Sequence, residues 1–311
     1  MIVVNVNAGL ANQMFHYAFG RSLIAKGYDV YFDQSNFKHR KSLSSKATFE
    51  DIRLQEVFPN IELKEMPRGH FKWVFPQEPT SSNFLKKKLY TARNRFMIKF
   101  HNFIGDENYI MEPSYGYCNN IEKKITSNCI FRGFWQSEKY FLHCEADIRK
   151  QFCFPPFDEE MNIKISEKMK NENSVAIHLR KGKDYLSSPL TGHGLCGVDY
   201  YMNAIKYIKK NVENPVFYVF TDNPTWLKDN LPQFNYTLVD WNEIVGKKNY
   251  RDMQLMSCCK HNIIANSTYS WWGAWLNSNP SKIVISPSIF FNPINDFFSS
   301  SDIICEDWVK I

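Results

Sequence analysis

Short β-branched runs alternate along the chain with segments whose apolar residues recur every three or four positions. Near the start, residues 2–6 form a β-branched run, residues 14–26 carry apolar side chains at helical spacing, and residues 30–32 form a second short run. The pattern predicts a strand, a helix and another strand in succession, which is how an α/β fold begins.

The second half of the chain repeats this alternation more clearly. The expected strands are residues 175–179, 215–221, 236–239, 262–265 and 282–286, and the expected helices are residues 159–171, 199–210, 224–230, 250–258 and 269–277. Because the connections between them are short, the pattern predicts a parallel, doubly wound sheet.

Residues 34–160 show weaker periodicity. A basic amphipathic helix is expected over residues 85–103, and the segment QFCFPPFD at residues 151–158 carries two prolines that indicate a domain boundary. We therefore expect an α/β protein of two Rossmann-like domains, residues 1–158 and 159–311, that face an interdomain cleft.

The composition fits this expectation. The 311 residues suffice for two domains of about 150 residues each, and 44% hydrophobic residues can form a core without disulfides or metal. The net charge of +6 suits a phosphate-bearing ligand. The basic residues do not form the stripe that is typical of nucleic-acid binders, so we expect no nucleic-acid partner.

The cysteines and the N-terminal segment indicate the cellular setting. The eight cysteines form no CxxC pair and no histidine spacing completes a zinc site, so we expect no bound metal. The start MIVVNVNAGLANQ has no basic leader, and no apolar run reaches the roughly 18 residues of a transmembrane helix. We expect a cytoplasmic protein. Peripheral contact of helix 85–103 with the inner face of a membrane stays open, although a solvated amphipathic helix is the simpler interpretation.

Polar residues follow four of the predicted strands, where ligands bind in parallel sheets. In the first loop, Gly9 allows a ligand to approach the backbone, and Asn12 and Gln13 stand at a helix start that favours an anion. The alternative is an ordinary turn in which Asn12 only caps the helix.

Two further strand ends carry charged residues. His178 and Arg180 point to the same face of their strand, and an arginine fork there suits a pyrophosphate. The alternative is a structural pair between Arg180 and Asp184. Asp222 ends the next strand, where it can accept hydrogen bonds from a ribose or from guanine, or can cap the helix expected over residues 224–230.

The fourth strand end carries a run of amide and hydroxyl side chains before a helix. Such a run can form a phosphate cradle together with the helix amides, or can cap the helix. The residues of the run are Asn266, Ser267, Thr268 and Ser270. We expect the tryptophans that follow, Trp271, Trp272 and Trp275, to lie in the core.

Four blocks of this sequence resemble a known family. NAGLANQMFHYAFGRSL is similar to the GGLGNQMFQYAFGRAL opening of the bacterial α-1,2-fucosyltransferases, glycosyltransferase family 11, and VAIHLRKGKDY resembles their HxRRGDY motif. FYVFTDNPTWLKDNL resembles their FSDDxxWxxxNL segment, and DMQLMSCCKHNIIANSTYSWWGAWLN resembles their longest block. The blocks occur in the family's order.

The resemblance implies a GT-B fold and metal-independent transfer of fucose from GDP-fucose, with inversion at fucose C1. The acceptor would be the 2-hydroxyl of a terminal galactose in an oligosaccharide such as lactose or N-acetyllactosamine. No cofactor is implied, because GDP-fucose is the donor substrate.

The resemblance also implies roles for individual residues. Arg180 would grip the donor pyrophosphate, within a motif that includes Lys181 and Asp184, while His178 and Asp222 would address the guanosine. The remaining contacts implied are phosphate contacts from Ser267, Thr268 and Ser270, and a reaction centre lined by Asn12 and Gln13.

The sequence departs from the family pattern at two of these blocks. Asn7 and Ala8 stand where the family usually has two glycines, and Ala11 replaces a third; alanine fits such a turn at little cost only where φ is negative. The arginine motif has Lys181 for a second arginine and one extra residue before Asp184, which changes the expected place of that carboxylate.

The general base is left open by the sequence. Candidates are His16, one turn after Asn12, the carboxylates Asp33 and Asp184, and an oxygen of the donor phosphate. We take Arg180, Asn12 and His16 as the catalytic candidates. Two other functions stay open: a related enzyme that uses another GDP-sugar or linkage, and a noncatalytic carbohydrate- or RNA-binding protein, which the placement of polar residues at strand ends disfavours.

Overall fold

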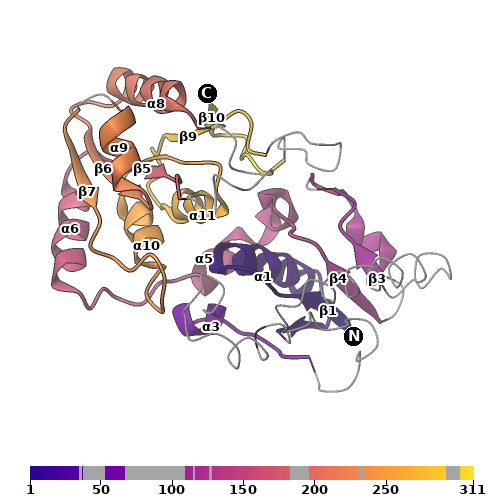
Figure 1. The fold of residues 1–311 in the computed structure, drawn as a ribbon. Coiled ribbons are helices and arrows are strands. Elements are labelled where there is room, and N and C mark those ends of the chain that lie inside the picture. Colours follow the sequence, from indigo (N-terminus) through magenta and orange to yellow (C-terminus); the bar gives the residue numbers. More distant parts are fainter. Residues whose placement is uncertain are drawn as a thin grey trace, which may run out of the picture.

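Two parallel sheets form the framework (Figure 1). The strands of the first sheet precede residue 158 in the sequence, and the strands of the second sheet follow it. The computed structural model describes residues 1–34, 37, 53–66, 109–114, 116–125, 128–182, 196–231, 234–291 and 302–311.

The first sheet has four strands in the order β2-β1-β4-β3, and all its pairs are parallel. Its strands are β1 (Ile2–Asn5), β2 (Val30–Asp33), β3 (Tyr109–Met111) and β4 (Cys129–Arg132). The other elements of this half are α1 (Leu10–Ala25), α3 (Leu54–Val57), α5 (Glu145–Gln151) and the 3-10 helices η1 (Ile121–Lys124), η2 (Glu138–Tyr140) and η3 (Leu142–Cys144).

The second sheet has six strands in the order β10-β9-β8-β5-β6-β7, and all its pairs are parallel. Its strands are β5 (Ser174–Leu179), β6 (Val216–Thr221), β7 (Tyr236–Val239), β8 (His261–Ile263), β9 (Val284–Ser286) and β10 (Val309–Lys310). Its helices are α6 (Glu160–Asn171), α8 (Val198–Asn211), α9 (Pro224–Asn230), α10 (Arg251–Cys258) and α11 (Thr268–Leu276).

The strand order reverses at β1 and β4 in the first sheet and at β5 in the second. In the first sheet β1 lies between β2 and β4, and in the second sheet β5 lies between β6 and β8. Helices that leave neighbouring strands in opposite directions open a crevice at such a point, outside the carboxyl ends of the strands. The loops after β1 and β4 and the loops after β5 and β8 are therefore the places where a ligand site is expected.

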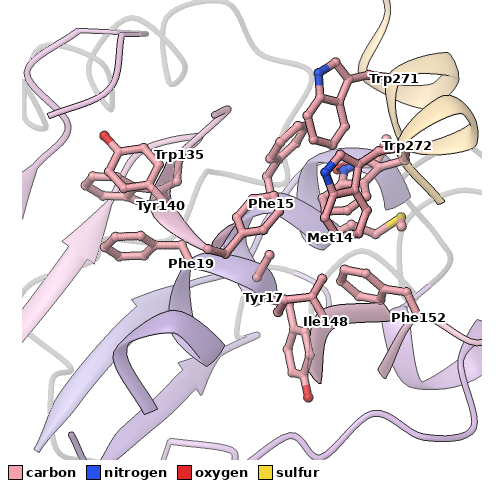
Figure 2. Close-up of a cluster of buried hydrophobic side chains, with 14 of the residues drawn as sticks. Met14, Phe15, Tyr17, Phe19, Trp135, Tyr140, Ile148, Phe152, Trp271 and Trp272 are labelled. Carbon is pink, nitrogen blue, oxygen red and sulfur yellow. Dashed lines mark hydrogen bonds between the residues drawn. The ribbon is translucent and has the colours of Figure 1, made fainter. Parts of the chain in front are cut away.

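Helix α11 packs into the core of the first half of the chain. Figure 2 shows Phe15 of α1 beside Trp271 and Trp272. The centroid of the Phe15 ring lies 4.6 Å from that of Trp271 and 4.8 Å from that of Trp272. The indole nitrogen of Trp272 donates a hydrogen bond to the Ala11 carbonyl at 3.0 Å. Trp271, Trp272 and Trp275 are all buried, which confirms them as core residues.

The proline-containing segment between the sheets is held by α10. Arg251, which is 3% exposed, donates to the carboxylates of Asp158 and Glu159 and to the carbonyl of Pro156. No helix or strand covers residues 153–158. The assignment of the two domains to residues 1–158 and 159–311 stays a prediction.

The elements expected in the second half are confirmed, with shifts of one or two residues at most ends. The first helix begins at Leu10, four residues earlier than expected, and its N-cap is Gly9 rather than Asn12. The strands β3, β4 and β10 were not expected, and each has only two to four residues. The expected helix 85–103 lies outside the described residues. Among the residues that are described, no helix is long and apolar enough to cross a membrane.

Ala8 does not meet the condition under which alanine fits the first loop at little cost. Its φ is 62°, in the left-handed region, where a Cβ atom is crowded by the backbone. The side chain of Gln13 holds this turn because its Nε2 donates to the Ala8 carbonyl at 3.0 Å. The turn thus survives the loss of glycine at a cost in backbone strain.

We expect Ala8→Gly to raise the free energy of unfolding by about 0.5–1 kcal/mol. Glycine removes about 1–2 kcal/mol of left-handed strain from the folded state. Part of this gain is offset because glycine also raises the conformational entropy of the unfolded chain. Urea denaturation measures the change. The matched control is Ala11→Gly, two residues into α1, which should lower the same free energy by up to about 1 kcal/mol. Equal destabilisation by both changes would contradict the strain at Ala8.

Candidate active site

A cleft lies where the strand-order reversals of the two sheets face each other. Its empty volume is about 830 Å³ when the open space at its mouth is included. The residues that line it are Gly9, Leu10, Ala11, Asn12, His178, Arg180, Thr221, Asp222, Glu243, Ile244, Asn249, Asp252, Ser267, Thr268 and Tyr269.

Two helix N-termini meet in this cleft, one from each half of the chain. Helix α1 begins after Gly9 and α11 begins after Ser267, and residues on both sides of each start line the cleft. The two ends are joined directly, because the Thr268 hydroxyl donates to Asn12 Oδ1 at 3.3 Å. Helix N-termini present backbone N–H groups and the positive end of the helix dipole, so their convergence favours an anion.

Arg180 adds a positive charge to the same cleft. It follows the last residue of β5 and forms an ion pair with Asp222, which follows the neighbouring strand β6. The second oxygen of Asp222 accepts from the Lys181 backbone N–H at 2.6 Å. The structure thus pairs Arg180 with Asp222. The expected alternative, a pair between Arg180 and Asp184, stays a prediction because Asp184 lies outside the described residues.

Asp222 does not cap the following helix. Asn223 does so, because its side chain accepts from the Trp226 N–H at 3.0 Å. Asp222 lines the cleft, but its two oxygens already serve Arg180 and the Lys181 amide. It therefore orients the arginine more readily than it contacts a nucleoside.

His178 lies on the wall of the cleft as a neutral side chain. Burial, and then the nearby charge of Arg180, lower the pKa of His178 from 6.5 to about 3. Its Nδ1 is buried and makes no hydrogen bond to any described residue, and its ring centroid lies 5.9 Å from that of Tyr269. His178 therefore lines the cleft as a neutral imidazole whose Nδ1 lies behind the cleft surface.

Asp252 is a site residue that the sequence reasoning missed. It stands in the first turn of α10 and lines the cleft, and burial raises its pKa from 3.8 to about 6, opposed by a hydrogen bond from Asn242. Asn242 Nδ2 donates to Asp252 Oδ1 at 2.7 Å, and Asn162 on α6 in turn donates to Asn242 at 2.8 Å. The available signal was an acidic residue in the first turn of a helix that follows a strand and a loop.

Only part of the amide and hydroxyl run at the start of α11 faces the cleft. Ser267 and Thr268 line the cleft, and Ser267 also caps the helix by accepting from the Tyr269 N–H at 3.4 Å. Ser270 is buried and donates to the backbone carbonyls of Ala265 and Ser267, so it does not face the cleft. The expected phosphate contact of Ser270 is therefore not supported, since its hydroxyl points inward.

Three other expected contacts also lie behind the cleft wall. The buried Asn266 accepts a hydrogen bond from the Cys196 thiol at 3.2 Å. The Lys181 ammonium lies 4.6 Å from the ring centroid of Trp226, and Gln13 supports the Ala8 turn. None of these three side chains lines the cleft, so their contribution is to its shape.

The candidates for the general base that the structure describes are buried. His16 is fully buried, its Nδ1 accepts the Asn7 N–H at 3.5 Å, and burial lowers its pKa to about 4. Asp33 is 2% exposed and accepts a hydrogen bond from Asn5 at 3.0 Å. Neither lines the cleft, so neither reaches a bound acceptor in this conformation.

One group of possible metal ligands occurs among the described residues. Ligand atoms of Glu138, Cys305 and Asp307 lie within 4.8 Å of one another. Glu138 already accepts a hydrogen bond from Trp275 Nε1 at 3.1 Å, and none of the three lines the cleft. This group does not contribute to the candidate active site.

The family model of Glycosyl transferase family 11 matches residues 76–311 of the chain. The chain belongs to this family. It is 32% identical to the Alpha-1,2-colitosyltransferase of Escherichia coli over 100% of this chain and 99% of that protein. It is 30% identical to the O-antigen biosynthesis glycosyltransferase WbnK of Escherichia coli, over 98% of this chain and 99% of that protein.

More distant similarities were also found. The chain is 23% identical to Galactoside alpha-(1,2)-fucosyltransferase 1 of Ateles belzebuth over 58% of this chain and 51% of that protein. Among solved structures, NodZ alpha-1,6-fucosyltransferase co-crystallized with GDP matches with a TM-score of 0.43 and 12% identity, over 88% of this chain and 90% of that chain. POFUT1 in complex with GDP matches with a TM-score of 0.42 and 11% identity, over 92% of this chain and 97% of that chain.

Membership of family 11 makes this chain a glycosyltransferase, as the sequence predicted. The two parallel sheets with helices, one in each half, confirm the predicted α/β fold of two Rossmann-like halves with a cleft between them. The family does not assign roles to individual residues here. Those assignments rest on the geometry of the cleft.

We expect Arg180→Ala to lower the turnover of sugar transfer by a hundredfold or more at saturating donor. A leaving diphosphate needs preorganised positive charge, and loss of one such donor costs about 3–4 kcal/mol of transition-state stabilisation. The matched control is Arg149→Ala, whose guanidinium stacks 4.2 Å from the Trp275 ring and does not line the cleft. Turnover of Arg180→Ala within a few-fold of the unmodified enzyme would remove Arg180 from the mechanism.

Proposed function

We propose that this chain transfers L-fucose from GDP-β-L-fucose to the 2-hydroxyl of a terminal galactose in an oligosaccharide, with inversion at the anomeric carbon. The observation that supports it best is the meeting of two helix N-termini and Arg180 in one interdomain cleft. A diphosphate is the part of a nucleotide-sugar that such a site recognises.

The same arrangement explains how the transfer would be catalysed. The oxygen of the galactose 2-hydroxyl attacks C1 opposite to the leaving GDP, which converts the β-linked sugar of the donor into an α-linked product. The proton of that hydroxyl passes to an oxygen of the leaving diphosphate. Negative charge develops on the terminal phosphate as its bond to the sugar breaks. The Arg180 guanidinium and the amides at the starts of α1 and α11 would stabilise that charge without reorganising, because the fold holds them in place.

We assign recognition of the guanine to Asp252 rather than to Asp222. A carboxylate can accept from both the N1–H and the 2-amino group of guanine. Asp222 is engaged by Arg180 and the third cleft carboxylate, Glu243, is exposed, whereas Asp252 is half-buried and oriented by Asn242. Asn242 fixes its orientation. The neutral His178 on the same wall offers a further polar contact to the nucleoside, as the sequence suggested.

A second donor is favoured by one relative. The Escherichia coli protein that is 32% identical over the whole chain is named an α-1,2-colitosyltransferase, and colitose is fucose without the 3-hydroxyl. A GDP-colitose donor would occupy the same diphosphate and guanine contacts. The name of the second Escherichia coli relative suggests that the acceptor is an O-antigen glycan.

A panel of donors and acceptors tests this proposal. Purified enzyme is incubated with GDP-fucose, GDP-colitose or GDP-mannose and with lactose, N-acetyllactosamine or a Galβ1,3-linked disaccharide, and products are identified by mass and linkage analysis. We expect transfer from GDP-fucose to give an α-1,2-linked product. Transfer from GDP-colitose alone would establish the second candidate, and a product with another linkage would contradict both.

We expect GDP affinity to fall on acidification below about pH 6, where the Asp252 carboxylate becomes protonated. Its folded pKa is raised to about 6, so the ionised form that accepts two hydrogen bonds is lost as the pH falls through that value. Asp252→Asn should bind GDP at least tenfold more weakly at pH 7.5, and the difference from the unmodified protein should narrow by pH 5. Calorimetry at several pH values measures both.

The control for this change is Asp229→Asn, on the exposed side of α9. Its affinity for GDP should equal that of the unmodified protein at every pH. The titration of the GDP phosphates changes the affinity of both proteins equally, so the comparison removes this effect. Equal GDP affinity of Asp252→Asn and the unmodified protein at pH 7.5 would exclude the proposed guanine contact.

A further inference from the structure

We propose that Gln136 is a positioning residue that turns the Asn12 amide so that its NH₂ group faces the terminal phosphate of the bound GDP-sugar. This inference rests on the proposed donor. Gln136 belongs to the loop after β4, does not line the cleft and was not identified from the sequence. Asn12 lines the cleft beside Thr268, at the point where the two helix starts meet.

The oxygen of the Asn12 amide is already fully used by protein donors. Gln136 Nε2 donates to Asn12 Oδ1 at 2.9 Å, and the Thr268 hydroxyl donates to the same atom at 3.3 Å. An amide oxygen has two lone pairs, so these two bonds exhaust it. Among the residues that the structure describes, none accepts a hydrogen bond from Asn12 Nδ2. The two N–H groups are therefore what Asn12 offers to the cleft.

Exchanging the oxygen and the NH₂ group of the Asn12 amide, with or without the same exchange in Gln136, is less favourable. If Asn12 alone were turned over, its NH₂ group would meet the NH₂ group of Gln136, which places donor against donor. If both amides turned over, the NH₂ group of Gln136 would be buried where its Oε1 now lies without a partner. A buried N–H group without a partner is rarer in proteins than a buried carbonyl without one, because the carbonyl is more easily left under-satisfied. The observed orientation is therefore the preferred one.

The loop after β4 holds Gln136 firmly in place. The Glu112 carboxylate accepts the backbone N–H groups of Phe134 at 2.6 Å and Trp135 at 3.0 Å. A Cβ atom at Gly133 would lie 2.3 Å from Glu112 Cβ, so only glycine fits at the start of this turn. Gln136 itself is 4% exposed. Such a side chain has little freedom to follow Asn12, and so it determines which face of the Asn12 amide is presented.

The chemistry at the cleft explains why the orientation matters. An N–H donor aimed at a phosphate oxygen makes a charge-assisted hydrogen bond, whereas an amide oxygen in the same place repels it. Asn12 shares the cleft with Arg180 and with the starts of α1 and α11, so its NH₂ group adds to the positive surroundings of the departing GDP. Turning the amide over would replace attraction with repulsion while leaving every backbone atom in place.

Two substitutions of Gln136 separate orientation from packing. Gln136→Met keeps the size of the side chain and removes the donor to Asn12. Gln136→Glu keeps the shape, but an ionised glutamate only accepts, so it draws the Asn12 NH₂ group toward itself and turns the amide oxygen to the cleft. When that glutamate is protonated it can donate again, and the original orientation returns.

Affinity for GDP, measured by calorimetry at pH 8 and pH 6, is compared with that of the unmodified protein at the same pH. The comparison removes the titration of the phosphates, of Asp252 and of the neighbouring Glu112 and His16. We expect both variants to bind GDP about tenfold more weakly at pH 8, the order of one hydrogen bond to a charged group. At pH 6 the Gln136→Glu deficit should shrink several-fold, while the Gln136→Met deficit should not change.

The matched control is Gln151→Met, which replaces another buried glutamine, 3% exposed and bonded to Tyr17 rather than to the cleft. Its GDP affinity should equal that of the unmodified protein. If Gln136→Met does not fold, the two pH values for Gln136→Glu still give the comparison within one protein.

The outcomes are distinguishable. Unmodified protein that binds no GDP would overturn the proposed donor and this inference with it. Normal GDP binding by both Gln136 variants at both pH values would overturn the positioning role alone. A Gln136→Glu deficit that is the same at pH 6 and pH 8 would also overturn it, because it would indicate a packing defect rather than a turned amide.

Discussion

Helix α11 packs against α1, and the rest of the active cleft depends on this contact. The Trp272 indole donates to the Ala11 carbonyl, and the Phe15 ring lies within 5 Å of two tryptophans. Buried aromatic side chains contribute large areas of apolar surface and tolerate little displacement. Because Ala11 lies in the first turn of α1, the hydrogen bond fixes the distance between the two helix starts. Core packing therefore sets the position of both helix starts in the cleft.

This arrangement places positive potential where a diphosphate would leave, and it uses few cationic side chains to do so. One arginine, held by Asp222, and two helix starts supply it. Arg180 is 19% exposed at its side chain, so its charge is not fully desolvated, while its orientation is set by the carboxylate. For a fully buried cation, the free-energy cost of desolvation can exceed the electrostatic attraction to its partner. Helix dipoles have no such cost, because their partial charges belong to the backbone.

The sequence predicted the large elements and about half of the cleft, for physical reasons that also explain its failures. Buried parallel strands such as β5 and β6 appear as continuous apolar runs, so their ends, and with them His178 and Arg180, could be found. The strands β3 and β4 have only three and four residues, and without them the position of Gln136 could not be derived. The pair between Arg180 and Asp222 could not be predicted, because it depends on which strand lies beside β5, which is a tertiary fact.

The strain at Ala8 and the orientation of Asn12 are linked by the same short loop. Ala8 takes a left-handed φ of 62° just before α1 begins at Leu10. Gln13 stabilises that turn because its side chain is fully buried and donates a hydrogen bond to the Ala8 carbonyl. Asn12 lies between these anchored residues and therefore cannot move its backbone to suit a ligand. Its side-chain amide is the remaining adjustable part, and donors from both halves of the chain hold its oxygen. A loop that is strained, anchored and bonded across the cleft is preorganised for an anion before any nucleotide binds.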